Sequence, residues 1–242
     1  MSKRTKLIVI IVCVAIAVCV VVTGAVLLAR YVQDKQDEED FAKLLAEYYN
    51  NKCGEFAEQN AELDGIEVVF LGDSLTDGCN LATYYPTYQA ANRGIGGDTT
   101  EGLKNRLAVS AYDVHPQVIV LLIGCNDINI GTSLDTVYAN YREIIEGIRS
   151  HLPDTKIVWC SLTPLGNQWA VHNERVVTCN QRIKSMAEQY GCTYVDLFGP
   201  LYNEETGEIH AAYTVEGVHF TDAGYLVVSG AVKKALADLL QH

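Results

Sequence analysis

The feature that most constrains the fold is a nearly unbroken apolar run, Val118 to Ile123, which ends at Gly124. Successive strand residues point to opposite faces, so a strand this apolar must be covered on both sides, as in the centre of a parallel sheet. Three other short apolar runs are strand candidates, at 66–71, 157–162 and 194–197. Segments with helical periodicity lie between them. This alternation predicts an α/β fold, a three-layer α/β/α sandwich around a central parallel sheet.

Three helices are predicted after these strands. One begins at Ser133 or Asp135 and ends at Ile148, a second covers 174–190, and the last covers 222–240 with Thr221 as its N-cap. Ligands of open parallel sheets bind beyond the carboxyl ends of the strands. The candidate loops are therefore 72–78, 93–100, 124–130, 163–169 and the segment before the last helix.

The N-terminal part does not look globular. Residues 7–29 carry no charge, follow basic residues, and as a helix would span roughly 34 Å, enough to cross a bilayer. We expect one transmembrane signal anchor with a cytoplasmic tail, 1–6, and an extracytoplasmic catalytic domain. The alternative is a cleaved signal peptide, but the small-residue triplet at 15–17 lies inside the apolar run and not after it.

An acidic segment at 37–40 precedes apolar residues at helical spacing, so 30–63 is predicted to be an amphipathic linker helix that packs on the domain or forms a stalk. Residues 64–242 form the predicted catalytic domain. The whole chain has a net charge of −12, and the part after residue 30 has 14 basic and 30 acidic residues. Such an acidic surface repels phosphate backbones, which argues against nucleic-acid binding. The cysteines show no metal-type spacing.

Four loops carry residues suited to acyl transfer. Gly72, Asp73, Ser74 and Leu75 follow the first strand directly, so the serine hydroxyl is exposed at a strand-to-helix turn. This is not the G-x-S-x-G elbow, since threonine occupies the position of the second glycine. Taken alone, the serine is equally explained as a helix cap.

The next two loops offer hydrogen-bond donors. The segment 92–100 reads NRGIGGDTT, and its glycines let backbone N–H groups approach a ligand, although a plain turn has the same composition. The segment 124–127 reads GCND at the end of the longest strand. The side-chain amide of Asn126 could donate to an oxyanion or simply satisfy loop backbone.

The fourth loop supplies a base. Glu216 stands three residues before His219, ahead of the last helix. A serine needs a base to take its proton, and that base needs an orienting acid on its other nitrogen. A carboxylate three residues earlier can reach back to serve that purpose.

The blocks GDSL, NRGIGGDTT, IGCND and EGVHFT, taken together, resemble the SGNH (GDSL-type) hydrolases, and the second block is especially similar to the platelet-activating-factor acetylhydrolase-like branch. The resemblance covers about residue 66 to the C-terminus. It implies a flavodoxin-like SGNH fold, Ser74 as nucleophile and His219 as base. It also implies an oxyanion hole of the Ser74 and Gly97 backbone and the Asn126 side chain, and no metal or other cofactor.

One position departs from the family pattern, which usually has aspartate where this chain has Glu216. Glutamate can serve as the acid, or His219 could be oriented by a backbone carbonyl or by Asp222. We expect a membrane-anchored serine esterase acting on a short-acyl glycan ester or a lysophospholipid-type ester, with Trp169 and Tyr213 lining the pocket. The alternative function is a non-catalytic carbohydrate- or lipid-binding domain.

Overall fold

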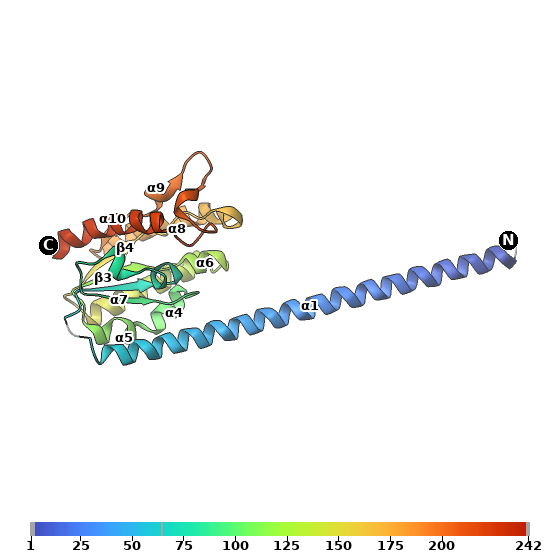
Figure 1. Cartoon of the computed structure of the whole chain (residues 1–242), viewed down its shortest axis with the longest axis horizontal. Helices are drawn as coiled ribbons and strands as arrows, with labels where there is room; N and C mark the ends of the chain where they lie inside the picture. The colour runs from blue at the N-terminus through green and yellow to red at the C-terminus, as the bar shows by residue number, and fades with distance from the viewer. Residues whose placement is uncertain (1–2, 64, 241–242) are drawn as a thin grey trace. The chain divides into compact units, whose positions relative to one another are not determined.

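The computed structural model describes the backbone of residues 3–63 and 65–240, and the side chains of these residues apart from 3–26 and 29 (Figure 1). The chain divides into two units, 1–48 and 49–242. The first is a single helix, the main part of α1, Lys3–Asn60. Phe41 and Leu44 on it are 60% and 61% exposed, so the apolar stripe predicted for the linker is not buried at these positions.

The predicted membrane segment, 7–29, lies outside the residues whose side chains are described, apart from two leucines. Within the described part of the chain, no helix has the length and apolar character needed to span a membrane. The anchor therefore stays a prediction from the sequence.

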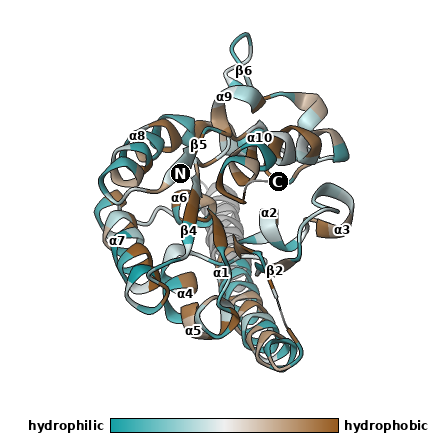
Figure 2. Cartoon of the chain, turned by 90° about the vertical axis from the view of Figure 1, so that its left-hand side faces the viewer, coloured by the Kyte–Doolittle hydropathy of each residue, from teal (hydrophilic) through white to brown (hydrophobic). Residues whose placement is uncertain are grey.

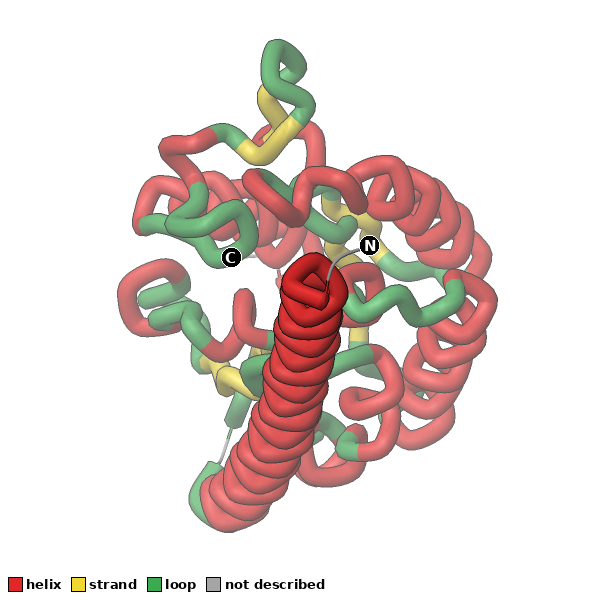
Figure 3. The backbone as a smooth tube through the Cα atoms, turned by 90° about the vertical axis from the view of Figure 1, so that its right-hand side faces the viewer, coloured by secondary structure: helices red, strands yellow, loops and turns green. Residues whose placement is uncertain are grey.

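The second unit is built on a five-stranded parallel sheet with the order β2-β1-β3-β4-β5. The strands are β1 Val68–Gly72, β2 Ala90–Gly94, β3 Val118–Leu122, β4 Lys156–Cys160 and β5 Thr193–Val195. In Figure 3 the strands lie enclosed by helices. The expected α/β fold with a central parallel sheet is confirmed, and β3 is buried along its whole length, as its sequence predicts.

The sequence analysis missed β2. Its residues, AANRG, contain no apolar run, because β2 is an edge strand and only part of it faces the core. Arg93 and Gly94 therefore end a strand and do not begin a loop. The register pairs Gly94 with Gly72 at the end of β1.

Helices cover both faces of the sheet, as Figure 2 shows with α7 and α8 on one side and α10 and α3 on the other. The first face carries α4 Thr100–Asn105, α5 Leu107–Ser110, α7 Leu134–His151 and α8 Asn173–Gln189. The second carries α2 Ser74–Asp77, α3 Leu81–Tyr84, α9 Phe198–Leu201 and α10 Asp222–Leu240. The three predicted helices are present, with Thr221 Oγ1 accepting from the Gly224 amide as an N-cap should.

The remaining elements are short. They are α6 Cys125–Asn129, the 3-10 turns η1 Tyr112–Val114, η2 Asn167–His172 and η3 Ala211–Tyr213, and a hairpin of β6 Tyr202–Asn203 and β7 Glu208–Ile209. The strand β2 pairs with one side of β1, and β3 pairs with the other side. The topological switch point of the sheet therefore lies at β1. The loops after β1, β2 and β3 consequently meet at one edge.

Candidate active site

Ser74 lies at the first position of α2, directly after the buried strand β1. Asp73 caps this short helix, with its Oδ1 accepting from the Leu75 amide at 3.0 Å. The cap holds the turn in place, so the serine side chain is presented, half-buried, at the carboxyl edge of the sheet.

His219 and Glu216 come to this serine from the loop before α10. His219 Nε2 lies 2.9 Å from Ser74 Oγ, and its Nδ1 contacts Glu216 Oε1. The same carboxylate oxygen accepts from the His219 backbone amide at 3.2 Å. A proton on Nδ1, held by the carboxylate, leaves the lone pair of Nε2 facing the serine, which is the tautomer a general base needs.

The alternative orienting acid, Asp222, is occupied elsewhere, since its carboxylate accepts from the Tyr84 hydroxyl at 2.8 Å. The glutamate can reach back because the loop turns at Gly217, where φ is 101°. A Cβ at that glycine would lie 2.3 Å from the carbonyl oxygen of Gly166, so both the backbone angle and the space require glycine.

Three donors lie at the carboxyl ends of neighbouring strands. Among the described residues, the backbone N–H groups of Ser74 and Gly97 have no hydrogen-bond partner. Gly97 is exposed and has a φ of 78°, a conformation that favours glycine. Asn126, in the first turn of α6, donates one amide hydrogen to the Asp98 carbonyl at 2.8 Å, and its second amide hydrogen has no partner among the described residues. The arrangement can bind a developing oxyanion.

A buried ion pair holds the Gly97 loop, and the sequence analysis did not find it. Arg106 Nε donates to Asp98 Oδ2 at 2.8 Å, and both side chains are almost completely buried. Asp127 accepts from the amide and the hydroxyl of Thr100 at 2.8 and 2.7 Å.

A model of the GDSL-like lipase/acylhydrolase family matches residues 70–227. The chain belongs to this family. The family predicted from the four blocks is thus confirmed.

Individual relatives are more distant. A Drosophila melanogaster protein, the platelet-activating factor acetylhydrolase IB subunit beta homolog, is 30% identical over 129 residues, which are 50% of this chain and 56% of the relative. The structure of a putative platelet activating factor from Streptococcus pneumonia is 26% identical, with a TM-score of 0.75 over 81% of this chain and 96% of that one. A GDSL-like lipase of Bacteroides thetaiotaomicron shares the fold at 23% identity, with a TM-score of 0.71 over 79% of this chain and 98% of that one.

The two side chains expected to line a pocket in this GDSL-like protein are not seen at the triad. Trp169 lies in η2, half-buried against the core, and the Tyr213 ring packs 5.2 Å from that of His210. The described contacts join neither of them to Ser74 or His219, so their pocket role stays a prediction. The triad itself is open, with the His219 side chain 51% exposed.

The family motif also contains a carboxyl group with an unusual environment. Asp73 is fully buried, and its Oδ2 has no hydrogen-bond partner among the described residues. Burial raises its pKa to about 7, against the effect of the hydrogen bond from Leu75. Between about pH 4 and pH 7 the carboxyl is therefore protonated in the folded protein and ionised in the unfolded chain.

We expect Asp73→Asn to change how stability depends on pH. Below about pH 4 the carboxyl is protonated in both states, whereas up to about pH 7 only the unfolded chain ionises, so the native protein loses stability as the pH rises. The loss reaches up to about 4 kcal/mol, and the amide variant should not show this contribution. Urea unfolding at pH 4 and pH 8 measures it. Equal pH dependence in both proteins would contradict the assignment.

Proposed function

We propose that this chain is a serine esterase that cleaves carboxylic esters through an acyl-enzyme. The observation that carries the proposal is the contact of Ser74 Oγ with His219 Nε2 at 2.9 Å, with Glu216 on the other ring nitrogen. A carboxylate, a histidine that it orients and a serine, in this order, form the arrangement that activates a serine hydroxyl.

The reaction would proceed in two steps. Ser74 Oγ attacks the ester carbonyl while His219 takes its proton, and the tetrahedral oxyanion is held by the N–H groups of Ser74 and Gly97 and the amide of Asn126. His219 then protonates the departing alkoxide, leaving the acyl group on the serine. A water that gives its proton to His219 hydrolyses this ester and restores the hydroxyl.

Asn126→Ala should reduce kcat on the order of a hundredfold with little change in KM, because an oxyanion donor acts mainly on the transition state. Asn129→Ala, three residues further along α6, is the matched control, and the side-chain hydrogen bond it has in the described structure goes to the Cys125 thiol at 3.8 Å. Steady-state kinetics on one soluble ester checks the pair. An Asn126 variant with parental kcat would exclude that side chain from the oxyanion hole.

For the substrate, we propose a short-acyl ester, an acetyl ester above all, carried by a glycan or by a lysophospholipid-type lipid. The openness of the site supports this, since Gly97 is exposed and the His219 and Glu216 side chains are 51% and 43% exposed. A site this exposed buries little of a long acyl chain. Binding of long acyl chains is favoured by burial of their apolar surface, so a short acyl group loses less here. The Drosophila relative is named as an acetylhydrolase, which agrees.

Hydrolysis of p-nitrophenyl acetate, butyrate and octanoate by the full chain tests the proposal. We expect kcat/KM to be highest for acetate. A preference for octanoate would replace the short-acyl proposal with a lipid esterase, and a folded but inert protein would favour the non-catalytic binding domain. The sequence feature that favours this alternative is glutamate in place of the family's usual aspartate at position 216. The Glu216 carboxylate nevertheless contacts His219 Nδ1.

The location of the catalytic domain remains a proposal from the sequence. The uncharged segment 7–29 and the basic residues before it favour a single-pass anchor with the domain outside the membrane. Protease treatment of intact cells would test it, because an extracytoplasmic domain is cleaved and an enclosed one is protected.

A further inference from the structure

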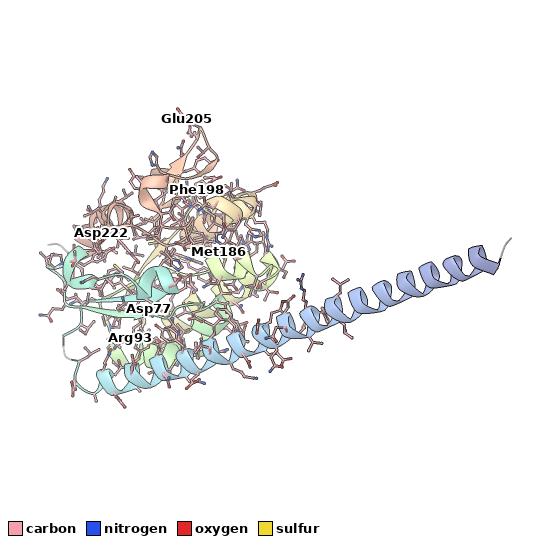
Figure 4. The ribbon with its side chains drawn as sticks, turned by 45° about the vertical axis from the view of Figure 1, so that its right-hand side comes forward. Asp77, Arg93, Met186, Phe198, Glu205 and Asp222 are labelled. Atoms are coloured by element: carbon pink, nitrogen blue, oxygen red, sulfur yellow. The ribbon has the colours of Figure 1, made fainter. Side chains whose placement is uncertain are left out.

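The end of α1 contacts the two elements on either side of the Gly97 loop, β2 and α4. This segment, residues 49–60, belongs to the same unit as the sheet. Tyr49 donates its hydroxyl hydrogen to the Gly102 carbonyl at 2.8 Å, and two amide oxygens, of Gln59 and Asn60, each accept from Arg93 at 2.8 Å. Arg93 is labelled beside this end of α1 in Figure 4.

One path leads from α1 to Gly97. Lys52 Nζ pairs with Asp77 Oδ1 at 3.0 Å, and both side chains are only 20% exposed, so water screens the pair less than it screens a surface pair. The second oxygen, Asp77 Oδ2, accepts from the Gly96 amide at 3.2 Å. Gly96 precedes Gly97 directly. The ammonium group thus fixes a carboxylate that in turn holds the backbone next to the free N–H.

A second path leads from α1 to Asn126. The Phe56 ring is 2% exposed and lies 4.6 Å from the guanidinium carbon of Arg93 and 6.0 Å from that of Arg106. Arg106 donates to the carbonyls of Gly72 and Arg93 and to Asp98 Oδ2. The Asp98 carbonyl accepts from Asn126. The ring therefore covers Arg106, the cation that joins the ends of β1 and β2 to the loop, and the neighbouring guanidinium of Arg93.

We propose that the end of α1 is a brace for the oxyanion hole, in which Lys52 positions the Gly97 backbone and Phe56 positions Asn126. Neither side chain touches the reacting atoms, so both are positioning residues. The catalytic part of the inference rests on the proposed function. The mechanical part, that α1 restrains the loop, does not.

Hydrogen exchange tests the mechanical part on the full chain. In Lys52→Met we expect the Gly96 amide, which donates to Asp77 Oδ2, to exchange faster by about tenfold, while the sheet amides are unchanged. Lys43→Met is the matched control, because Lys43 lies on α1 and its ion pair in the described part of the chain is with Asp40 at 3.0 Å, with its side chain 71% exposed. Unchanged exchange at Gly96 in Lys52→Met would overturn the brace.

Kinetics tests the catalytic part. Lys52→Met and Phe56→Leu should each lower kcat about tenfold with KM within about twofold, and Lys43→Met should match the parent. In an Asn126→Ala background, Phe56→Leu should lower kcat less than about twofold, since the group it positions is gone. Full additivity of the two substitutions would overturn the role given to Phe56. If Phe56→Leu does not fold, Lys52→Met alone decides.

The two proposals fail in different ways. A parent chain that hydrolyses no ester while Lys52→Met still loosens the Gly97 loop refutes the esterase and retains the brace. An active parent whose Lys52 and Phe56 variants keep parental kcat and exchange retains the esterase and refutes the brace.

Discussion

Ser74→Ala should abolish ester hydrolysis, with a loss of kcat on the order of ten-thousandfold or more. In the proposed mechanism the hydroxyl forms the acyl-enzyme, and His219 Nε2 lies 2.9 Å from it. The variant should also lose covalent labelling by a fluorophosphonate and keep its thermal unfolding midpoint. Activity and labelling are measured on the same purified preparation.

Ser133→Ala is the control for this substitution. Ser133 also stands at the start of a helix, where its Oγ accepts from the Thr136 amide at 3.1 Å, but it has no histidine partner in the described structure. Its loss should cost about 1 kcal/mol of stability and no activity. A Ser74 variant that is still labelled and still active would show that another residue is the nucleophile.

Glu216→Gln should reduce kcat on the order of a thousandfold while KM changes little. The amide keeps the size of the side chain but loses the charge that stabilises the imidazolium and selects the proton on Nδ1. His219 would then more often carry its hydrogen on Nε2, the nitrogen that must accept the serine proton. Rates with p-nitrophenyl acetate at several pH values measure the effect.

Two further variants identify the acid. Glu216→Asp, which restores the usual residue of the family, should keep activity within about tenfold of the parent because a carboxylate is retained. Asp222→Asn should leave kcat unchanged, since that carboxylate accepts from Tyr84 and not from His219. If Asp222→Asn is the damaging substitution and Glu216→Gln is not, the roles of the two acids are reversed.

Parts of the fold with a local signal were predictable. The run Val118 to Ile123 indicates a strand buried on both faces, and β3 is such a strand. The helix predicted over 222–240 is α10, because its apolar periodicity and its Thr221 cap are both local. Local patterns report burial well when a segment is buried on one face or on both. The edge strand β2 has neither pattern, so it was missed.

The sequence by itself determined the family and the residue types of the site, because three of the four blocks stand at the carboxyl ends of strands of a parallel sheet and the four together carry a serine, two kinds of donor and a histidine. Only the tertiary structure brought Ser74 to His219 across 145 residues, and only it chose Glu216 over Asp222 as the histidine's partner. The tertiary structure likewise placed the Phe56 ring against the guanidinium groups of Arg93 and Arg106. These contacts arise from packing between distant segments, and no periodicity or spacing within a segment encodes which distant group will face it.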